Sequence, residues 1–284
     1  MLNWIPRYSS VLDIINTKGM TDSLILELGS GSHGLGCCFD KPFVGLDTEF
    51  PDPISPNMIP ILASIDHVPF SDDSFDLVVS LDMLEHIPAD KRLSVIQQML
   101  RVSSRFVIIG FPCGEIAEQA ERHLASWFER DGGNAPPWLQ EHLQNGLPSS
   151  QEVEEYLDTI PNMRHEVFGN ENVAFHIMVV IADHIDISRD YSEASLVDNR
   201  DDWIELCKKA NFSPVYRSIY LIEKLESNET EKIERTTSGV YKTLVCPRCR
   251  AELTIDDPAN ELTCLGCSSK YCFTEDHIPD MRCR

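Results

Sequence analysis

The sequence predicts an α/β fold built on a mostly parallel sheet, followed by a small β-rich unit near the C-terminal end. The apolar run Leu24–Leu28 has the length of a buried parallel strand, and it breaks directly into a glycine-rich turn. Comparable short runs follow along the chain, at Phe43–Asp47, Ile59–Ile65, Phe75–Ser80 and Arg105–Gly110. Two Cys-x-x-Cys pairs stand apart from this pattern near the C-terminal end. We therefore expect a sheet domain and a separate small domain.

The composition narrows the class of protein. The 284 residues suffice for one large domain and one small one. A net charge of −22 argues against broad, non-specific binding to nucleic acid or to an anionic membrane, because both need a basic surface. No run approaches the ~20 apolar residues of a membrane span, and residues 1–20 have no signal-peptide core. We expect a cytoplasmic protein, with nucleic acid disfavoured as a partner.

The remaining elements follow from apolar spacing and from helix signals. Helices are predicted at residues 4–18, 35–41, 94–102 and 201–210. Another helix is expected to start at Ser150, which suits an N-cap. Residues 172–184 fit a helix or a strand, and we favour the helix. The β-rich run at residues 214–224 is expected to close the sheet as its last strand.

The glycine turn after the first strand is the first candidate binding site. Gly29, Gly31 and Gly34 have the Gly-x-Gly-x-x-Gly spacing, and such turns let a ligand approach the backbone where a Cβ would collide. In open α/β sheets, ligands bind at this end of the strands. The glycines alone fit both NAD and S-adenosylmethionine. Glu27 favours the second, since a carboxylate before the turn repels a pyrophosphate but can hold the ammonium group of a methionine moiety.

The second predicted strand ends in an acid, Asp47, with Glu49 close behind. An acid at this point is placed to accept hydrogen bonds from both ribose hydroxyls of an adenosine cofactor. A solvated loop acid is the alternative. The strand–turn–strand context favours the ribose role, and it favours Asp47 over Glu49.

A second motif separates the two cofactors. Residues 68–70 read Val-Pro-Phe, residues 73–78 read Asp-Ser-Phe-Asp-Leu-Val, and residues 84–87 read Leu-Glu-His-Ile. This combination closely resembles the class I S-adenosylmethionine-dependent methyltransferases of the type 11 group, whereas NAD-binding domains lack the second block. The resemblance covers roughly residues 24–114. It implies a Rossmann-like sheet of seven mostly parallel strands with helices on both faces.

The resemblance also implies roles for individual residues. The methionine part would lie against Glu27, Gly29, Ser30 and Gly31, the ribose against Asp47, the adenine against Ser64 and Ile65, and the sulfonium side against Leu81 and Asp82. Two features depart from the family: His33 stands where a third glycine is common, and the first helix is short.

Asp82 and His86 are the candidate catalytic residues. A direct acid–base role for His86 competes with a structural one, in which Glu85 and His86 cap and orient the helix after the fourth strand. We favour the structural role. Methyl transfer is an in-line displacement that proximity and orientation can accelerate, so it requires no dedicated base.

Residues 115–149 are rich in charge and in glycine and proline, which is typical of a lid. The resemblance places acceptor recognition in this segment. The candidate contacts are His123, Trp127, Trp138 and His142, with packing on the core as the alternative for each.

The C-terminal cysteines predict a metal site. Cys246, Cys249, Cys264 and Cys267 form two Cys-x-x-Cys pairs with fourteen residues between them. Four thiolates in this arrangement make a closed tetrahedral zinc site, which leaves no position for water or substrate, so the Zn²⁺ is expected to be structural. Residues 241–281 also resemble the small zinc-ribbon proteins that activate RNA and translation-factor methyltransferases.

The sequence therefore predicts three parts. A methyltransferase domain spans residues 1–226, with the acceptor insertion at 115–149, followed by a linker at 227–240 and a four-cysteine zinc ribbon at 241–284. The expected activity is methyl transfer from S-adenosylmethionine to a small molecule or a glycan. Transfer to a tRNA or a protein through the ribbon, and a non-catalytic scaffold that binds a cofactor or a partner, are the alternatives. A protein partner would bind through the zinc ribbon.

Overall fold

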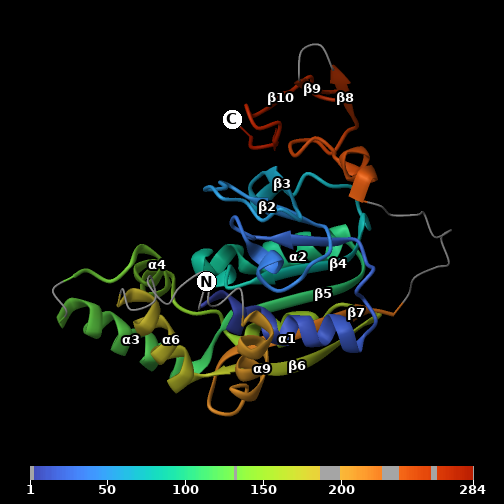
Figure 1. The fold of residues 1–284 in the computed structure, drawn as a ribbon. Coiled ribbons are helices and arrows are strands. Elements are labelled where there is room, and N and C mark those ends of the chain that lie inside the picture. Colours follow the sequence, from blue (N-terminus) through green and yellow to red (C-terminus); the bar gives the residue numbers. More distant parts are fainter. Residues whose placement is uncertain (1–2, 131–132, 186–198, 226–236, 257–260, 284) are drawn as a thin grey trace.

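The computed structural model describes residues 3–130, 133–185, 199–225, 237–256 and 261–283. Within these ranges, eleven strands form one sheet in the order β6-β7-β5-β4-β1-β2-β3-β11-β10-β9-β8. Figure 1 shows this sheet with the C-terminal segment at one end and a group of helices to one side. The predicted α/β class is confirmed. The sheet is longer than seven strands because the C-terminal segment adds β8–β11 to it.

The elements lie close to their predicted places. The strands before the C-terminal segment are β1 (Ile25–Leu28), β2 (Phe43–Asp47), β3 (Met58–Leu62), β4 (Phe75–Leu81), β5 (Ser103–Pro112), β6 (Met163–Asn172) and β7 (Val215–Lys224). The α-helices are α1 (Trp4–Thr17), α2 (Arg92–Val102), α3 (Gly114–Arg130), α4 (Pro137–Asn145), α5 (Ser150–Asp158), α6 (Val173–His184) and α9 (Arg200–Lys209). Residues 172–184, which fit a helix or a strand by sequence, thus form a helix, α6, as we favoured. Ser149, not Ser150, is the N-cap of α5, and its hydroxyl accepts a hydrogen bond from the Glu152 amide.

The sheet is parallel in its centre and mixed at one side. β1 to β5 run parallel, and β7 runs antiparallel to both of its neighbours, β5 and β6. β7 therefore lies inside the sheet, and the edge strand on this side is β6, which the sequence analysis did not predict. Most side chains of β6 are exposed or half-buried as far as residue 169. An edge strand faces solvent along one side, so β6 lacks the continuous apolar run that identifies a buried strand.

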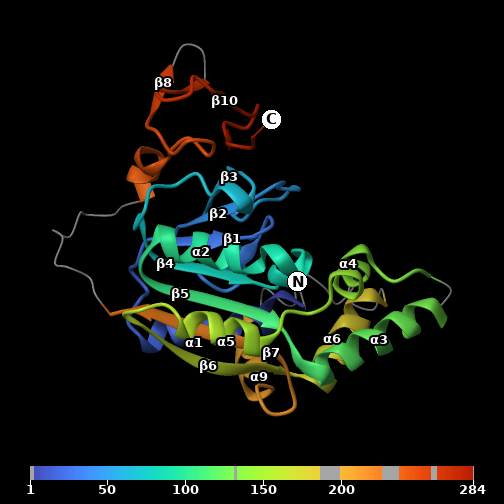
Figure 2. The ribbon, with the colours of Figure 1, turned by 180° about the vertical axis from the view of Figure 1, so that it is seen from behind.

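Helices cover both faces of the sheet (Figures 1 and 2). On one face, α2 and α5 bury Met99 and Leu157 in an apolar core. On the other face, α1 and α9 bury Ile15 and Ile204 in a second core. The central strands contribute side chains to both cores. Because these strands are packed on both faces, the carboxyl end of each strand is held in a fixed position.

The predicted acceptor insertion forms part of a helical lobe beside the sheet. In Figures 1 and 2, α3, α4 and α6 stand together at the side where β4 and β5 end. The lobe has two small apolar clusters of its own, made by Ala117, Ala120, Val173 and Tyr216 and by Leu124, Phe128, Leu139 and Val180. Residues 115–149 therefore supply α3 and α4, while α6 comes from further along the chain.

The C-terminal segment joins the sheet at β3. β8 (Leu253–Asp256), β9 (Glu261–Cys264) and β10 (Lys270–Phe273) form an antiparallel meander, and β11 (Pro279–Asp280) pairs with β10 and, in parallel, with β3. The Met281 amide donates to the Leu62 carbonyl at 2.7 Å, and the Val245 amide donates to the Pro69 carbonyl at 2.9 Å. Apolar residues of both parts share one core. The segment thus continues the sheet.

The connection between the two parts is described only in its second half. The predicted linker at residues 227–240 lies outside the described residues as far as position 236, and Thr237–Thr243 form the 3₁₀ helix η5. Within the described ranges, no helix combines the length and apolar character needed to cross a bilayer.

Candidate active site and metal centre

The glycine turn after β1 is built from residues that need the absence of a side chain. Gly29, Gly31 and Gly34 have φ values of +73°, +53° and +47°, which L residues with side chains rarely adopt. A Cβ on Gly34 would stand 2.1 Å from Glu27 Oε2, and a Cβ on Gly29 would stand 2.8 Å from Met83 Cγ. The turn therefore brings its backbone close to its neighbours and closes tightly over Glu27, with Gly29 and Gly31 half-buried.

Glu27 supports this turn from below. Its side chain is fully buried, and both carboxylate oxygens have partners: Tyr8 Oη donates to one at 2.6 Å and the Leu35 amide to the other at 2.7 Å. Burial raises the pKa of Glu27 to about 7, against these two hydrogen bonds. Each oxygen of Glu27 thus accepts one hydrogen bond from within the protein, which fits a role in shaping the turn; direct contact with an ammonium group stays a prediction.

Asp47 lies on the other side of the turn, at the end of β2. Its Oδ2 accepts a hydrogen bond from the Gly31 amide at 2.8 Å, and its Oδ1 accepts one from the Thr48 amide at 2.6 Å. The side chain is partly exposed, as a ribose ligand would need. Ser30, by contrast, is buried and its hydroxyl donates to the Gly31 carbonyl at 3.0 Å. Ser30 therefore acts on the shape of the turn.

Helix α1, predicted at residues 4–18, covers the turn. A Cβ on Gly31 would lie 3.3 Å from the Trp4 ring. Trp4 also meets the His33 ring edge-on at 5.6 Å and stacks on Tyr8 at 6.5 Å between ring centroids. His33, which stands where a third glycine is common in the family, is thus part of an aromatic cluster over the glycine turn.

The other predicted cofactor residues lie at the ends of β3 and β4. Ser64 is the N-cap of the 3₁₀ helix η2 (Ile65–His67), and its hydroxyl accepts a hydrogen bond from the Asp66 amide at 3.3 Å. Ile65 is half-buried against the apolar core. Leu81 is buried at the end of β4, where a Cβ on Gly110 would meet it at 2.6 Å. The fold brings these residues to the same edge of the sheet as Asp47.

Asp82 follows β4 and is locked in a buried ion-pair network. Arg217 holds both of its carboxylate oxygens, at 2.6 and 2.7 Å, and Arg7 Nε lies 3.2 Å from one of them. Arg217 also pairs with Glu171, which contacts His176 at 3.2 Å. Burial alone would raise the pKa of Asp82, but the two guanidinium groups hold it well below its usual range. Asp82 therefore stays ionised and is a poor proton acceptor.

The same balance applies to the second acid of the network. Burial would raise the pKa of Glu171, but the charges of Arg217 and His176 lower it to about 2. Arg217 thus forms ion pairs with two buried carboxylates. The charges of Asp82 and Glu171 in turn raise the pKa of Arg217, although burial alone would lower it. Arg217 is only 1% exposed and was not predicted as a site residue. No local sequence signal marks it, because its partners come from β4 and β6.

A cavity of about 230 Å³ opens beside this network. Its walls come from α1 and the residue before it, the segment after β4 with the 3₁₀ helix at Leu84–His86, the helices α4 and α6, and the start of β7. The lining residues are Asn3, Arg7, Asp82, His86, Trp138, His142, His176, Tyr216 and Arg217. Two of the four predicted acceptor contacts, Trp138 and His142, are among them. His123 is exposed on α3, and Trp127 packs against Phe128 and His184.

His86 takes part in a cluster of ionisable groups from three elements. It ends the 3₁₀ helix η3 (Leu84–His86), and its Nε2 lies 3.2 Å from His142 Nε2. Burial and the neighbouring His142 lower the pKa of His86, against the charge of Glu141. Next to it, Glu85 is fully buried, and burial and the charge of Asp82 raise its pKa well above the usual range.

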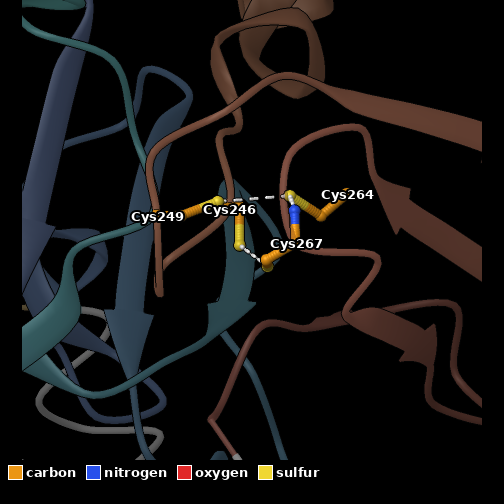
Figure 3. Close-up of side chains that lie close together, drawn as sticks. All are labelled: Cys246, Cys249, Cys264 and Cys267. Carbon is orange, nitrogen blue, oxygen red and sulfur yellow. Dashed lines mark hydrogen bonds between the residues drawn. The ribbon is translucent and has the colours of Figure 1, made fainter.

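The four C-terminal cysteines come together as predicted; Cys246, Cys249, Cys264 and Cys267 are called the cysteine cluster below. All four sulfur atoms lie within 4.8 Å of one another, with 3.6 Å between those of Cys246 and Cys267 and 3.4 Å between those of Cys249 and Cys264 (Figure 3). The amides of Gly266 and Cys267 donate to Cys264 Sγ. Sulfur ligands of a tetrahedral zinc lie about 3.8 Å apart, so the four thiolates fit Zn²⁺.

Comparison with known proteins supports the assignment of the sheet domain. Residues 26–108 match the family described as methyltransferase domain. No curated protein matches the chain significantly. Among solved structures, the plantazolicin methyltransferase BpumL in complex with a monoazolic desmethylPZN analog and SAH is 13% identical, with a TM-score of 0.50, and the match covers 78% of this chain and 85% of that one.

Two further solved structures are similar at a lower level. Magnesium protoporphyrin IX methyltransferase from Synechocystis PCC 6803 is 11% identical, with a TM-score of 0.44, over 76% of this chain and 80% of that one. A complex between the Haloferax volcanii Trm112 methyltransferase activator and a methyltransferase is 16% identical, with a TM-score of 0.43, over 78% of this chain and 98% of that one.

The strand order and the glycine turn define a methyltransferase fold of the α/β class. Together with the domain match, they make the chain an S-adenosylmethionine-dependent methyltransferase.

Proposed function

We propose that S-adenosylmethionine binds across the carboxyl ends of β1 to β4. The backbone of the Gly29–Gly31 turn, with Ser30 beneath it, would receive the methionine part, and Glu27 would act by holding that turn in shape. Asp47 would accept the ribose hydroxyls, Ser64 and Ile65 would lie against the adenine, and Leu81 and Asp82 would line the sulfonium side. The half-buried, positive-φ glycine turn beside the partly exposed carboxylate of Asp47 supports this assignment.

We further propose that the methyl acceptor is a small polar molecule or a single glycan residue. The observation that carries this proposal is the cavity of about 230 Å³ next to Asp82, whose walls are mostly polar or charged. Small-molecule sites measure about 300–1,000 Å³, so a space of this size suits a small acceptor group. The net charge of −22 disfavours a nucleic-acid acceptor.

The cavity residues would act by binding and orientation. The acceptor atom would attack the sulfonium methyl carbon, and the electron pair of the breaking C–S bond would return to sulfur. Because Asp82 is held in ion pairs with Arg217 and Arg7, its proposed role is to fix these cations at the cavity wall. Proximity and orientation then supply most of the acceleration.

The zinc ribbon has a structural role in this proposal. The cysteine cluster offers four thiolates and hence a closed site, so Zn²⁺ bound there would hold the fold of residues 241–284 and not take part in methyl transfer. Because β11 pairs with β3, which precedes the proposed adenine-binding residues, the ribbon would also stabilise that edge of the cofactor site.

The test is methyl transfer from radiolabelled S-adenosylmethionine to fractionated cell extract. Label in the metabolite or glycan fraction, strongly reduced with Asp47→Ala at subsaturating cofactor, is the expected result. Label confined to RNA or to protein would contradict the small-acceptor proposal and support action through the ribbon. Cofactor binding without transfer to any fraction would support the scaffold alternative.

A further inference from the structure

Two histidines face each other at the wall of the cavity. His86 Nε2 and His142 Nε2 are 3.2 Å apart. The opposite nitrogen of each ring has a carboxylate partner: His86 Nδ1 lies 2.6 Å from Glu141 Oε2, and His142 Nδ1 lies 2.7 Å from Glu121 Oε1. Tyr216 Oη donates to the same Glu121 oxygen at 2.7 Å, which fixes this carboxylate. The ring orientations are therefore held from behind.

This arrangement determines where the lone pairs point. A carboxylate oxygen accepts hydrogen bonds, so each Nδ1 carries its proton, and each neutral ring then has an unprotonated Nε2. Two nitrogen lone pairs thus meet at 3.2 Å. Such a contact between two neutral rings is repulsive; it becomes favourable when one ring is protonated and donates to the other, or when a metal ion binds both nitrogens.

A third donor lies beside the pair. Glu85 is fully buried, and among the described residues neither of its carboxylate oxygens has a hydrogen-bond partner. Its Oε1 lies 3.9 Å from His142 Nε2, and one ligand atom from each of Glu85, His86 and His142 falls within 4.8 Å of the others. Ionising a buried carboxyl group that has no partners is costly, because the charge has lost its hydration without compensation.

One bound cation would remove both problems. Two histidine nitrogens on a tetrahedral zinc, each about 2.05 Å from the metal, lie about 3.3 Å apart, close to the separation observed here. The carboxylates of Glu121 and Glu141 behind the two imidazoles are the outer partners that metal-binding histidines usually have. Glu85 would complete a set of two nitrogens and one oxygen.

The site would be open on one side. His86 and His142 both line the cavity of about 230 Å³. Three protein ligands with one free position facing a cavity is the arrangement of catalytic metal sites, whereas structural sites have four protein ligands. We propose that Glu85, His86 and His142, together called the histidine cluster, bind a divalent transition metal such as Zn²⁺ whose free position receives an oxygen atom of the methyl acceptor.

The second half of this proposal rests on the proposed function and deepens it. A hydroxyl group bound to the metal would release its proton to water more easily, since the cation stabilises the alkoxide. The oxygen would then attack the methyl carbon, and the C–S electron pair would return to sulfur, leaving S-adenosylhomocysteine and a methyl ether. The acceptor class is thus a small molecule with a hydroxyl group.

The test counts metal in the full chain. After loading with Zn²⁺ and removal of the excess by gel filtration, plasma mass spectrometry is expected to find two zinc ions per chain, one for each group of ligands. His86→Gln combined with His142→Gln should reduce the count to one, and Cys264→Ser combined with Cys267→Ser should remove the other. His123→Gln, an exposed histidine on α3, should leave two.

Two checks keep the count decisive. Co²⁺ gives ligand-field bands in both clusters, but thiolate charge-transfer bands only in the cysteine cluster. A histidine variant that loses ligand-field intensity and keeps the full charge-transfer bands therefore assigns the second site. If the double histidine variant loses its melting transition, the count is made on Glu85→Gln, which keeps the size of the side chain. One zinc per chain in the wild type, or a count that these variants leave unchanged, would overturn the proposal.

The count needs no acceptor, so this result is independent of the proposed function. A second metal ion without methylation of any small molecule would contradict only the acceptor class. Methylation of a small molecule by a chain that holds one zinc ion would contradict only the histidine cluster.

Discussion

The cysteine cluster and the histidine cluster offer different surroundings to a metal. The four cysteine sulfurs face one another and would surround an ion completely, from two turns of a single short segment. The histidine cluster has three donors, from η3 and α4, and its histidines also face the cavity. The first arrangement suits a fold held by metal, and the second suits a metal that meets a substrate.

The difference also shows in what stands behind the ligands. The cysteine sulfurs receive backbone amides and lie beside small hydroxyl groups, such as that of Ser269. The histidines are backed by charged carboxylates, and Asp82 with its arginines lies on the adjoining wall. A structural site therefore needs only its own loops, whereas the open site depends on a polar network drawn from much of the domain.

Removing the cysteine cluster should have the largest effect. In Cys264→Ser combined with Cys267→Ser, loss of Zn²⁺ would remove a binding free energy that zinc-finger peptides place at about 10–16 kcal/mol, and residues 237–283 should unfold. Limited proteolysis would show new cleavage in this segment. Cys272→Ser is the matched control, because Cys272 is exposed and outside the cluster. Equal protease resistance in both variants would contradict a structural zinc.

The network behind the open site comes next. Arg217→Met leaves Asp82 and Glu171 without their main cation in a buried site, which should cost about 3–5 kcal/mol of unfolding free energy. Urea denaturation measures this loss. Arg164→Met is the control, because Arg164 pairs with Glu223 on an exposed edge and such pairs contribute about 0–1 kcal/mol. Similar losses of unfolding free energy in the two variants would show that the buried ion-pair network contributes no more to stability than an exposed ion pair.

Glu27 is a buried acid whose two carboxylate oxygens both accept hydrogen bonds, in contrast with Glu85, and its effect on stability can be measured. Its pKa is about 7 in the folded chain and about 4.5 when unfolded, so between these pH values the folded state binds the extra proton. Stability should therefore fall as pH rises from 4.5 to 7, by on the order of 3 kcal/mol from this group.

The measurement is the difference in stability between wild type and Glu27→Gln across that pH range. The difference should shift in favour of the variant as pH rises, because glutamine does not titrate. Glu49→Gln, at an exposed acid, should follow the wild type. A difference that does not change with pH would contradict the raised pKa.

The smallest expected effect concerns Asp47 in the proposed cofactor site. Asp47→Ala should weaken binding of S-adenosylhomocysteine by about 10- to 100-fold, the equivalent of the 1.5–3 kcal/mol that hydrogen bonds to a charged group contribute. Isothermal titration calorimetry gives the affinity. Glu49→Ala should bind as the wild type does. Unchanged affinity in Asp47→Ala, or an equal loss in both variants, would remove the ribose role from Asp47.

The sequence predicted what depends on local pattern. The strand Phe43–Asp47 coincides with β2 because every residue but the last is buried, and the cysteine cluster follows from spacing within two turns. β6 escaped prediction because an edge strand shows no apolar run. Local pattern thus identifies elements that are buried on both faces and ligands that lie near one another in the chain.

The features that the sequence did not predict depend on the direction of a side chain or on partners that are distant in the chain. Glu27 could not be seen to point under the turn, because Tyr8 on α1 supplies one of its partners. His86 and His142 were noted separately, but their contact requires that α4 fold back onto η3 across 56 positions of sequence. Arg217 is likewise defined by carboxylates from two other strands.

The pairing of β3 with β11 sets an order of events during synthesis. The outer edge of β3 at Leu62 meets its neighbour at Asp280, 218 residues further along the chain. At a translation rate of about 5–20 residues per second, roughly ten to forty seconds pass between the two. Throughout this interval the nascent sheet presents an unpaired edge, which favours association with other chains. Arrival of the ribbon therefore covers the carboxyl end of this edge, at Leu62, where the newly made chain would otherwise offer unpaired backbone groups.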